Sequence, residues 1–522
     1  MTFADALATG YGFDDASIVL GAALEGSRVH PEPKVRIPLA MFNRHGLVAG
    51  ATGTGKTRTL QLMAEQLSAA GVPVFVADIK GDLQGIAVEG PAGERIASRA
   101  TEIGYEWKPR AAPVEFVSLT GRNGVQLRAT VSSFGPLLLA KVLRLNETQT
   151  SVLSLVFKYC DDQQLPLLDF SDLRAVLQYL TSDEGKGALA EYGSMSRQTV
   201  GVLLRKMVEL EQQGAEQFFG EPEFDVHDLI VTTPDGRGVV TSLELADVQD
   251  KPALFSTFMM WLLAELYHNL PEVGDLAKPK LVFFFDEAHL LFNDAPRAFL
   301  DQIQQVIRLI RSKGVGVFFV TQTPKDVPEE VLAQLGNRVQ HALRAHTPDD
   351  EKALRATVRT YPKTPFYDLE ETLTSLGIGE AIVTGLSPKG VPTPVIATRL
   401  IPPGARMGTL TPEELKVELA QSDLLDEYGR VIDRESAREM LAERMAGTRP
   451  ADVPEPEGRS EPSGRSRSTR QSTAETTGKR VLGAMGTQFG RAIGTAVMRG
   501  VMGALGVKPP RRTTRRRTRW GF

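Results

Sequence analysis

The chain has 522 residues, of which 42% are hydrophobic and 24% charged, and its net charge is −4. This composition is ordinary for a soluble globular protein and leaves room for a large α/β domain with additions. The single cysteine, Cys160, excludes an internal disulfide, and there is no run of about 20 apolar residues and no segment resembling a signal peptide, so we expect a cytoplasmic protein.

The first 40 residues predict two edge strands, at 17–21 and 35–39, ahead of a short apolar strand at 46–49. Residues 50–57 then read Gly-Ala-Thr-Gly-Thr-Gly-Lys-Thr and fit the P-loop pattern G-x-x-x-x-G-K-[ST]. A helical pattern follows to about residue 70 and completes the strand, loop and helix that the motif needs. The alternative, a glycine-rich turn in an unrelated α/β protein, is disfavoured by the complete motif and its flanks.

The P-loop predicts that the chain binds a nucleoside triphosphate. Its glycines let successive N–H groups turn toward the β-phosphate, and the helix N-terminus adds a partial positive charge. Lys56 is expected to reach the β- and γ-phosphates, and the Thr57 hydroxyl to hold Mg²⁺. The residues expected to bind the nucleotide are Gly50, Thr52, Gly53, Thr54, Gly55, Lys56, Thr57, Arg58 and, after the next strand, Asp78.

Two further apolar stretches end in acidic residues. Residues 74–78 predict a second buried strand that ends in Asp78, and ligand-facing side chains lie at the carboxyl ends of parallel strands. Asp78 either faces the nucleotide or caps the following turn, and the sequence leaves both open. A third strand, 281–285, runs into Asp286, expected to coordinate Mg²⁺, and Glu287, expected to polarise the attacking water. A buried strand that ends in two acids by chance is the alternative.

Between these strands the pattern changes to helices. From 134 to 230 leucine and valine recur at helical spacing, which indicates a packed helical insertion inside the nucleotide-binding domain. An apolar helix is expected at 254–270, after the insertion. Gln322, at the end of a later buried strand, is expected to contact the γ-phosphate or its water. The further strands expected are 114–119, 238–243, 314–322, 337–344, 380–383 and 394–398.

The C-terminal part changes character twice. Residues 450–480 are rich in Pro, Gly, Ser, Thr, Glu and Arg and predict a disordered linker. Residues 481–508 predict a glycine-rich amphipathic helix that packs on a neighbour or lies on a membrane surface. The arginine-rich end, 509–522, attracts anionic membrane or nucleic acid, unless it only solubilises the chain. The predicted divisions are 1–40 (lead-in strands), 41–133 (core, first part), 134–230 (helical insertion), 231–402 (core, second part), 403–449 (C-terminal helices), 450–480, 481–508 and 509–522.

The motifs GATGTGKT, VADIKGDL, FFFDEAH, RSKGVGVFFVTQTP and NRVQHALRA, in this order, resemble the HerA-like and FtsK-like translocases, most of all the bacterial branch of HerA-like proteins. The likeness covers roughly residues 15–400. It implies an α/β fold with a RecA-like P-loop NTPase core, a mostly parallel sheet, the helical insertion and a disordered, basic C-terminal tail. It also implies a homo-oligomeric ring, usually a hexamer, with ATP bound between subunits and DNA in the pore.

The resemblance assigns roles by position. Lys56 and Thr57 match the Walker A pair, Asp286 and Glu287 the Walker B acid and catalytic base, and Gln322 the sensor glutamine. Asp78 matches the acid after the second strand. Arg311 is the first choice for an arginine finger that acts on the neighbouring subunit, and Arg344 is the second. Archaeal HerA-like proteins carry a β-barrel domain before the P-loop, whereas only 49 residues precede Gly50 here, which leaves a nuclease partner an open question.

The function predicted is therefore a ring-forming DNA translocase or helicase that hydrolyses ATP with Mg²⁺ at subunit interfaces. DEAH helicases and ABC-type ATPases are disfavoured, because we find neither the second-lobe motif of the former nor the LSGGQ-like signature of the latter. The alternative from another class is an ATP-gated oligomeric scaffold, tethered to membrane or nucleoid through its tail.

Overall fold

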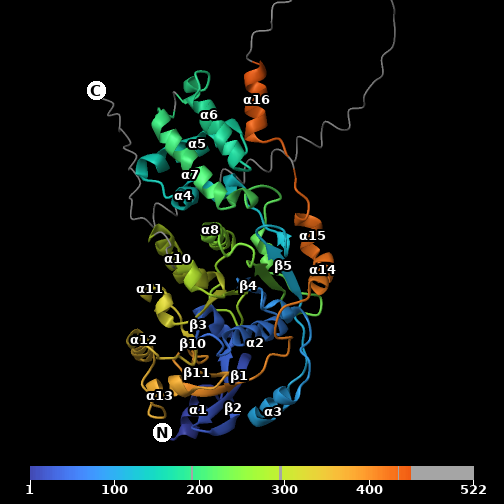
Figure 1. Ribbon diagram of the computed structural model, residues 1–522, viewed down its shortest axis with the longest axis vertical. Coiled ribbons are helices and arrows are strands. Elements are labelled where there is room, and N and C mark those ends of the chain that lie inside the picture. Colours follow the sequence, from blue (N-terminus) through green and yellow to red (C-terminus); the bar gives the residue numbers. More distant parts are fainter. Residues whose placement is uncertain (190–191, 293–296, 433, 448–522) are drawn as a thin grey trace, which may run out of the picture. The chain divides into compact units, whose positions relative to one another are not determined.

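The computed structural model describes residues 1–189, 192–292, 297–432 and 434–447, and they contain a sheet of 12 strands (Figure 1). The predicted linker, glycine-rich segment and arginine-rich tail lie outside the described residues. The strands stand in the order β2-β1-β12-β11-β10-β3-β9-β8-β4-β7-β5-β6. Their bounds are β1 (Ser17–Glu25), β2 (Arg28–Pro38), β3 (Gly46–Ala49), β4 (Val74–Asp78), β5 (Val114–Ser118), β6 (Val125–Gln126), β7 (Val240–Glu244), β8 (Leu281–Phe285), β9 (Val315–Thr321), β10 (Asn337–His341), β11 (Glu380–Thr384) and β12 (Ile396–Leu400).

The eight strands from β10 to β6 are parallel to one another, and β11, β12, β1 and β2 are added antiparallel on the β10 side. This confirms the predicted α/β fold with a mostly parallel sheet. The central strands β8 and β9 are buried along their whole length, as expected for parallel strands covered on both faces. Strand β9 separates β3, which leads into the P-loop, from β8, which leads into Asp286 and Glu287.

Sixteen α-helices are assigned within the described residues. Four of them, α4 to α7, fill the range predicted as the helical insertion, between β6 and β7, and gather together in Figure 1. The bounds are α1 (Phe3–Tyr11), α2 (Lys56–Ala69), α3 (Glu94–Ile103), α4 (Val131–Val142), α5 (Glu147–Gln163), α6 (Phe170–Thr181), α7 (Arg197–Gln212), α8 (Pro252–Asn269), α9 (His289–Phe292), α10 (Arg297–Ile310), α11 (Glu329–Leu332), α12 (Pro348–Arg359), α13 (Leu369–Ser375), α14 (Pro412–Ala420), α15 (Asp423–Tyr428) and α16 (Ala437–Gly447).

Two hydrophobic cores lie on the two faces of the sheet. Because successive side chains of a strand point to opposite faces, Phe283 and Phe285 of β8 join one core, whereas Phe284 joins the other. The first core includes α8 and α10 and continues into the helices of the insertion, and the second includes α1 and α2. The insertion therefore shares its core with the nucleotide-binding sheet.

The described segment after β12 returns to the P-loop helix. The buried carboxylate of Glu65 on α2 accepts hydrogen bonds from the backbone N–H groups of Gly404 and Ala405, at 2.8–3.0 Å. The Gln61 side chain, one turn earlier, donates to the carbonyl of Arg406 at 2.8 Å. This segment is thus fixed to the helix that the P-loop opens.

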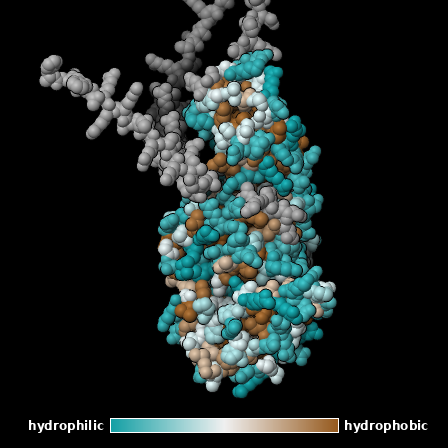
Figure 2. All heavy atoms as spheres, turned by 90° about the vertical axis from the view of Figure 1, so that its left-hand side faces the viewer, coloured by the Kyte–Doolittle hydropathy of each residue, from teal (hydrophilic) through white to brown (hydrophobic). Residues whose placement is uncertain are grey.

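No helix within the described ranges is long and apolar enough to cross a membrane. The face drawn in Figure 2 is mostly hydrophilic, and its apolar residues occur in scattered patches. Such scattered apolar residues are normal on a protein surface.

Helix α8 carries a half-buried acid, Glu265. Burial raises the pKa of Glu265 to about 7 from its ordinary 4.5, and the nearby charge of Glu223 raises it further. Asn269, one turn later, donates a hydrogen bond of 2.7 Å to this carboxylate. The folded chain therefore holds a proton on Glu265 at pH values where the unfolded chain has released it.

We expect Glu265→Gln to stabilise the protein at alkaline pH. Since the pKa is raised on folding, the wild type loses stability as pH rises from about 4.5 to 7. The variant should be more stable by about 1–3 kcal/mol at pH 8 and nearly equal at pH 4, as measured by urea denaturation. The exposed Glu330→Gln serves as control, and equal pH dependence of wild type and Glu265→Gln would contradict the prediction.

Candidate active site

The P-loop spans the gap between β3 and α2 and is tied to its neighbours by backbone hydrogen bonds. Gly50 N–H donates to the carbonyl of Thr321 at 3.2 Å, and Ala51 N–H to that of Ala342 at 2.8 Å. Gly50 and Gly55 have φ of +155° and +112°, in the region that favours glycine. A Cβ at Gly50 would also lie 2.4 Å from the Cβ of His341. The loop therefore depends on glycine both for conformation and for space.

Lys56 begins α2 and is buried, with 8% of its surface exposed. Its Nζ donates to the carbonyl of Ala51, across the loop, at 3.2 Å. Burial lowers the pKa of Lys56, against the opposing attraction of Glu287 and Asp286. The ammonium is thus held inside the phosphate loop and faces the acids at the end of β8.

The other predicted residues of the loop differ in placement. Thr52 and Gly53 are exposed at the tip, whereas Thr54 is buried and its hydroxyl donates to the carbonyl of Ala51 at 2.7 Å. Thr57 is half-buried in the first turn of α2. Arg58 donates to the side chain of Gln61 at 3.2 Å, along its own helix.

Three carboxylates meet at the carboxyl ends of β4 and β8. Oxygen atoms of Asp78, Asp82 and Asp286 all lie within 4.8 Å of one another. Oδ2 of Asp286 and Oδ1 of Asp82 are buried without a hydrogen-bond partner. Burial, with the neighbouring charge of Glu287, raises the pKa of Asp286 to about 7. Buried, unpartnered carboxylate oxygens are suitable ligands for a hard cation, so these residues fit Mg²⁺.

Asp78 caps the turn that follows β4, one of the two alternatives left open by the sequence. Its carboxylate accepts hydrogen bonds from the N–H groups of Lys80, Gly81 and Leu83, at 2.8–3.1 Å. The second alternative also stands, because the same carboxylate belongs to the acidic cluster. Burial raises the pKa of Asp78 to about 6 and that of Glu244, its partner across β4 and β7, to about 8.

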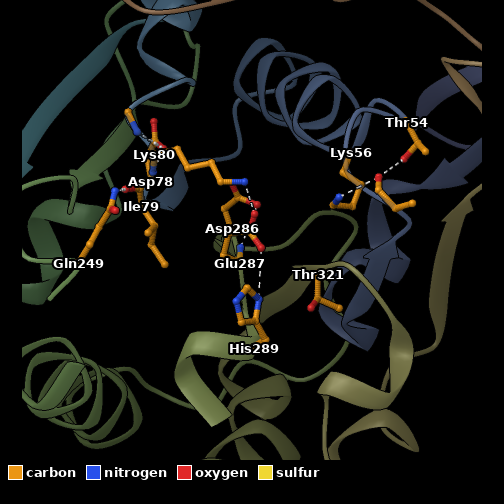
Figure 3. A network of polar contacts seen from close by, with 12 residues as sticks. Thr54, Lys56, Asp78, Ile79, Lys80, Gln249, Asp286, Glu287, His289 and Thr321 are labelled. Atoms are coloured by element: carbon orange, nitrogen blue, oxygen red, sulfur yellow. Dashed lines mark hydrogen bonds and ion pairs between the residues drawn. The ribbon is translucent and has the colours of Figure 1, made fainter. Parts of the chain in front are cut away.

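Glu287, the residue after Asp286, is drawn in the close-up of Figure 3. It is 5% exposed and has a left-handed backbone, with φ of +46°. Its Oε1 forms an ion pair with Nζ of Lys80, and its Oε2 lies 3.2 Å from Nδ1 of His289. The expected base is therefore held by a lysine in the turn after β4.

The end of β9 carries a buried threonine followed by the predicted sensor glutamine. Thr321, its last residue, is buried, and its hydroxyl donates to Oδ2 of Asp326 at 2.7 Å. Gln322, the predicted sensor, comes next and is exposed. The charge of Asp326 also opposes the lowering of the Lys56 pKa by burial.

The two candidate arginine fingers lie at opposite ends of the parallel strands. Arg311 precedes β9, at the amino ends of the parallel strands, and its Nη2 lies 3.7 Å from Oδ1 of Asp275. The seven residues of β9 span roughly 23 Å, so Arg311 is remote from its own P-loop. Arg344 is exposed and follows β10, at the same edge as the P-loop.

Lys56, Asp78, Asp286 and Glu287 gather at the carboxyl ends of the parallel strands (Figure 3), whereas Arg311 lies at their amino ends. Sequence reasoning missed Lys80, Glu244 and His341. His341 lies under the P-loop, where its Nε2 shares a hydrogen bond of 2.9 Å with the hydroxyl of Thr59, and burial lowers its pKa to about 4. The only sequence signal for Lys80 and Glu244 was a charged residue at or just after a strand end.

A phosphate loop after one parallel strand, an acidic pair after a second, and a strand between them define a RecA-like P-loop ATPase. A sequence profile of the family described as helicase HerA-like, C-terminal, matches residues 25–511. The chain belongs to this HerA-like helicase family, as the motifs predicted.

Among its relatives is the DNA double-strand break repair helicase HerA of Saccharolobus solfataricus, 23% identical over 363 residues. The match covers 69% of this chain and 65% of the relative. The probable helicase MJECL08 of Methanocaldococcus jannaschii is 25% identical over 403 residues, which are 72% of this chain and 69% of that protein. The unbound bacterial conjugative coupling protein TrwBΔN70 has a TM-score of 0.49 and 16% identity, and covers 76% of this chain and 97% of its own.

We expect Asp286→Asn to weaken the binding of Mg²⁺ with nucleotide. Loss of one anionic ligand from the cluster should lower Mg²⁺-dependent nucleotide affinity about tenfold or more, while binding in EDTA changes little. Titration of a fluorescent ATP analogue at graded Mg²⁺ measures both. Asp275→Asn, exposed at the opposite edge, is the matched control, and an unchanged Mg²⁺ dependence of Asp286→Asn would contradict the assignment.

Proposed function

We propose that this chain is an ATP-hydrolysing DNA translocase or helicase that works as a homo-oligomeric ring. The observation that carries the proposal is that Lys56 faces Asp286 and Glu287 at the carboxyl ends of the parallel strands (Figure 3), where Asp286 also meets Asp78 and Asp82. The family membership and the DNA repair helicase among the relatives support the link to DNA. The chain spans 65% of that relative, so its substrate and partners enter here as part of the proposal.

In the proposed reaction, water attacks the γ-phosphorus of ATP and the bond to the bridging oxygen breaks, which releases ADP. Lys56 binds the β- and γ-phosphates, and the carboxylate of Glu287 takes the proton from the attacking water. The Thr57 hydroxyl and Asp286 are the residues that would hold Mg²⁺, with Asp78 and Asp82 close by. Bound Mg²⁺ offsets negative charge on the phosphate oxygens.

The position of Arg311 supports the proposed ring. Because it lies at the edge remote from its own P-loop, it can neutralise phosphate charge only in a neighbouring copy. Arg344, at the P-loop edge, is the second candidate and would act from the opposite side. Six subunits are the number that the family resemblance implies. The scaffold alternative relied on residues 481–522, which lie outside the described part of the chain.

The central experiment is the ATPase rate with and without double-stranded DNA, together with the particle mass with and without nucleotide. We expect stimulation by DNA and a nucleotide-dependent ring. Glu287→Gln should lower kcat by about 10²–10⁴-fold and keep ATP binding, because it removes the proton acceptor and leaves the phosphate contacts. The exposed Glu371→Gln is its control. Full turnover by Glu287→Gln would exclude Glu287 as the base.

We expect Arg311→Ala to lower kcat by about 10³-fold or more, since it removes charge neutralisation from the neighbour's site. Mixing Arg311→Ala with Glu287→Gln subunits should restore part of the activity, because some interfaces then combine an intact arginine with an intact base. Steady-state rates across mixing ratios measure the restoration. Arg344→Ala in the same mixtures distinguishes the two arginines, and no restoration with either would contradict a finger that acts between subunits.

A further inference from the structure

Lys80 is held in place by its backbone while its side chain remains accessible. Its N–H donates to the Asp78 carboxylate at 3.1 Å, and the preceding carbonyl, of Ile79, accepts from the Gln249 side chain at 2.5 Å. The side chain is 49% exposed, yet its ammonium forms an ion pair with Glu287, which is buried (Figure 3). A fixed turn thus aims a solvent-reachable cation at the expected base.

Glu287, the partner of Lys80, has an unusual backbone conformation. Glu287 has φ of +46°, a conformation that is unfavourable for a non-glycine residue and that persists where surrounding contacts determine it. One oxygen of this carboxylate, Oε1, is already paired with the Lys80 ammonium. In this arrangement the Glu287 carboxylate is in place but is paired with Lys80.

We propose that Lys80 is a positioning residue that holds Glu287 until the γ-phosphate of ATP draws the lysine away. This inference rests on the proposed function of the site. The ammonium exchanges one anion for another, so that arrival of the γ-phosphate both binds Lys80 and frees the base. ADP lacks the γ-phosphate and leaves the Lys80–Glu287 pair intact.

The location of Lys80 supports this exchange. Its charge acts on Lys56, in the phosphate loop, as well as on Glu287 and Asp286. A γ-phosphate bound by Lys56 and facing the end of β8 therefore lies within the electrostatic reach of Lys80. A static ion pair that nucleotide does not disturb is the competing explanation.

A double-mutant cycle tests the exchange at equilibrium. Affinities for a non-hydrolysable imido analogue of ATP and for ADP are measured with Mg²⁺ for four proteins: wild type, Lys80→Met, Glu287→Gln and the double variant. Glu287→Gln should bind the analogue about 5–10-fold tighter than wild type, because the neutral amide holds Lys80 less strongly. The double variant should lose that gain, and ADP affinity should stay within about twofold throughout.

The controls separate this inference from the proposed function. Lys80→Arg, which keeps the charge, should retain the gain in the Glu287→Gln background, and the exposed Lys389→Met should leave it unchanged. An equal gain with and without Lys80, or a gain for ADP as large as for the analogue, would overturn the exchange. If the wild type binds neither nucleotide, or Lys56→Ala binds as well as wild type, the proposed function itself fails.

Discussion

The parallel alignment of β3, β9, β8 and β4 is the constraint on which the rest of the structure depends. It brings the carboxyl ends of strands that are distant in sequence together, and a phosphate loop and several carboxylates meet there. Burial there disfavours charge, so the pKa values of Asp78, Glu244 and Asp286 all rise. The acids remain together because backbone N–H groups, amide side chains and lysines compensate them.

Two lysines from different parts of the chain place positive charge beside these carboxylates. Lys56 belongs to the phosphate loop and is buried, whereas Lys80 comes from the turn after β4 and is half-exposed. The first is fixed by the loop carbonyl of Ala51, and the second by the carboxylate of Glu287. A triphosphate brings negative charge into a region where positive charge is already distributed between a buried lysine and a half-exposed one. This difference in exposure underlies the proposed order of events at the site.

The sequence predicted what depends on local pattern. The P-loop, the acidic pair after β8 and most core strands are readable because short apolar runs end in recognisable residues. Helices α1 and α12 escaped the prediction, although each begins with a capping box, at Thr2 with Asp5 and at Thr347 with Asp350. Lys80 and His341 were missed for another reason. Their partners, Glu287 and Thr59, are brought to them by strand order, which no local pattern encodes.

If Arg311 acts on the site of a neighbouring copy, as we propose, its separation from its own P-loop by the length of β9 restricts how copies of this chain can associate. A two-fold dimer buries the same patch on both copies, and one patch does not hold groups on opposite edges of a sheet. Head-to-tail contact is the arrangement that joins them, and every added subunit then leaves one P-loop and one Arg311 without a partner at the two ends of the assembly. All of these groups are paired only when the last subunit contacts the first.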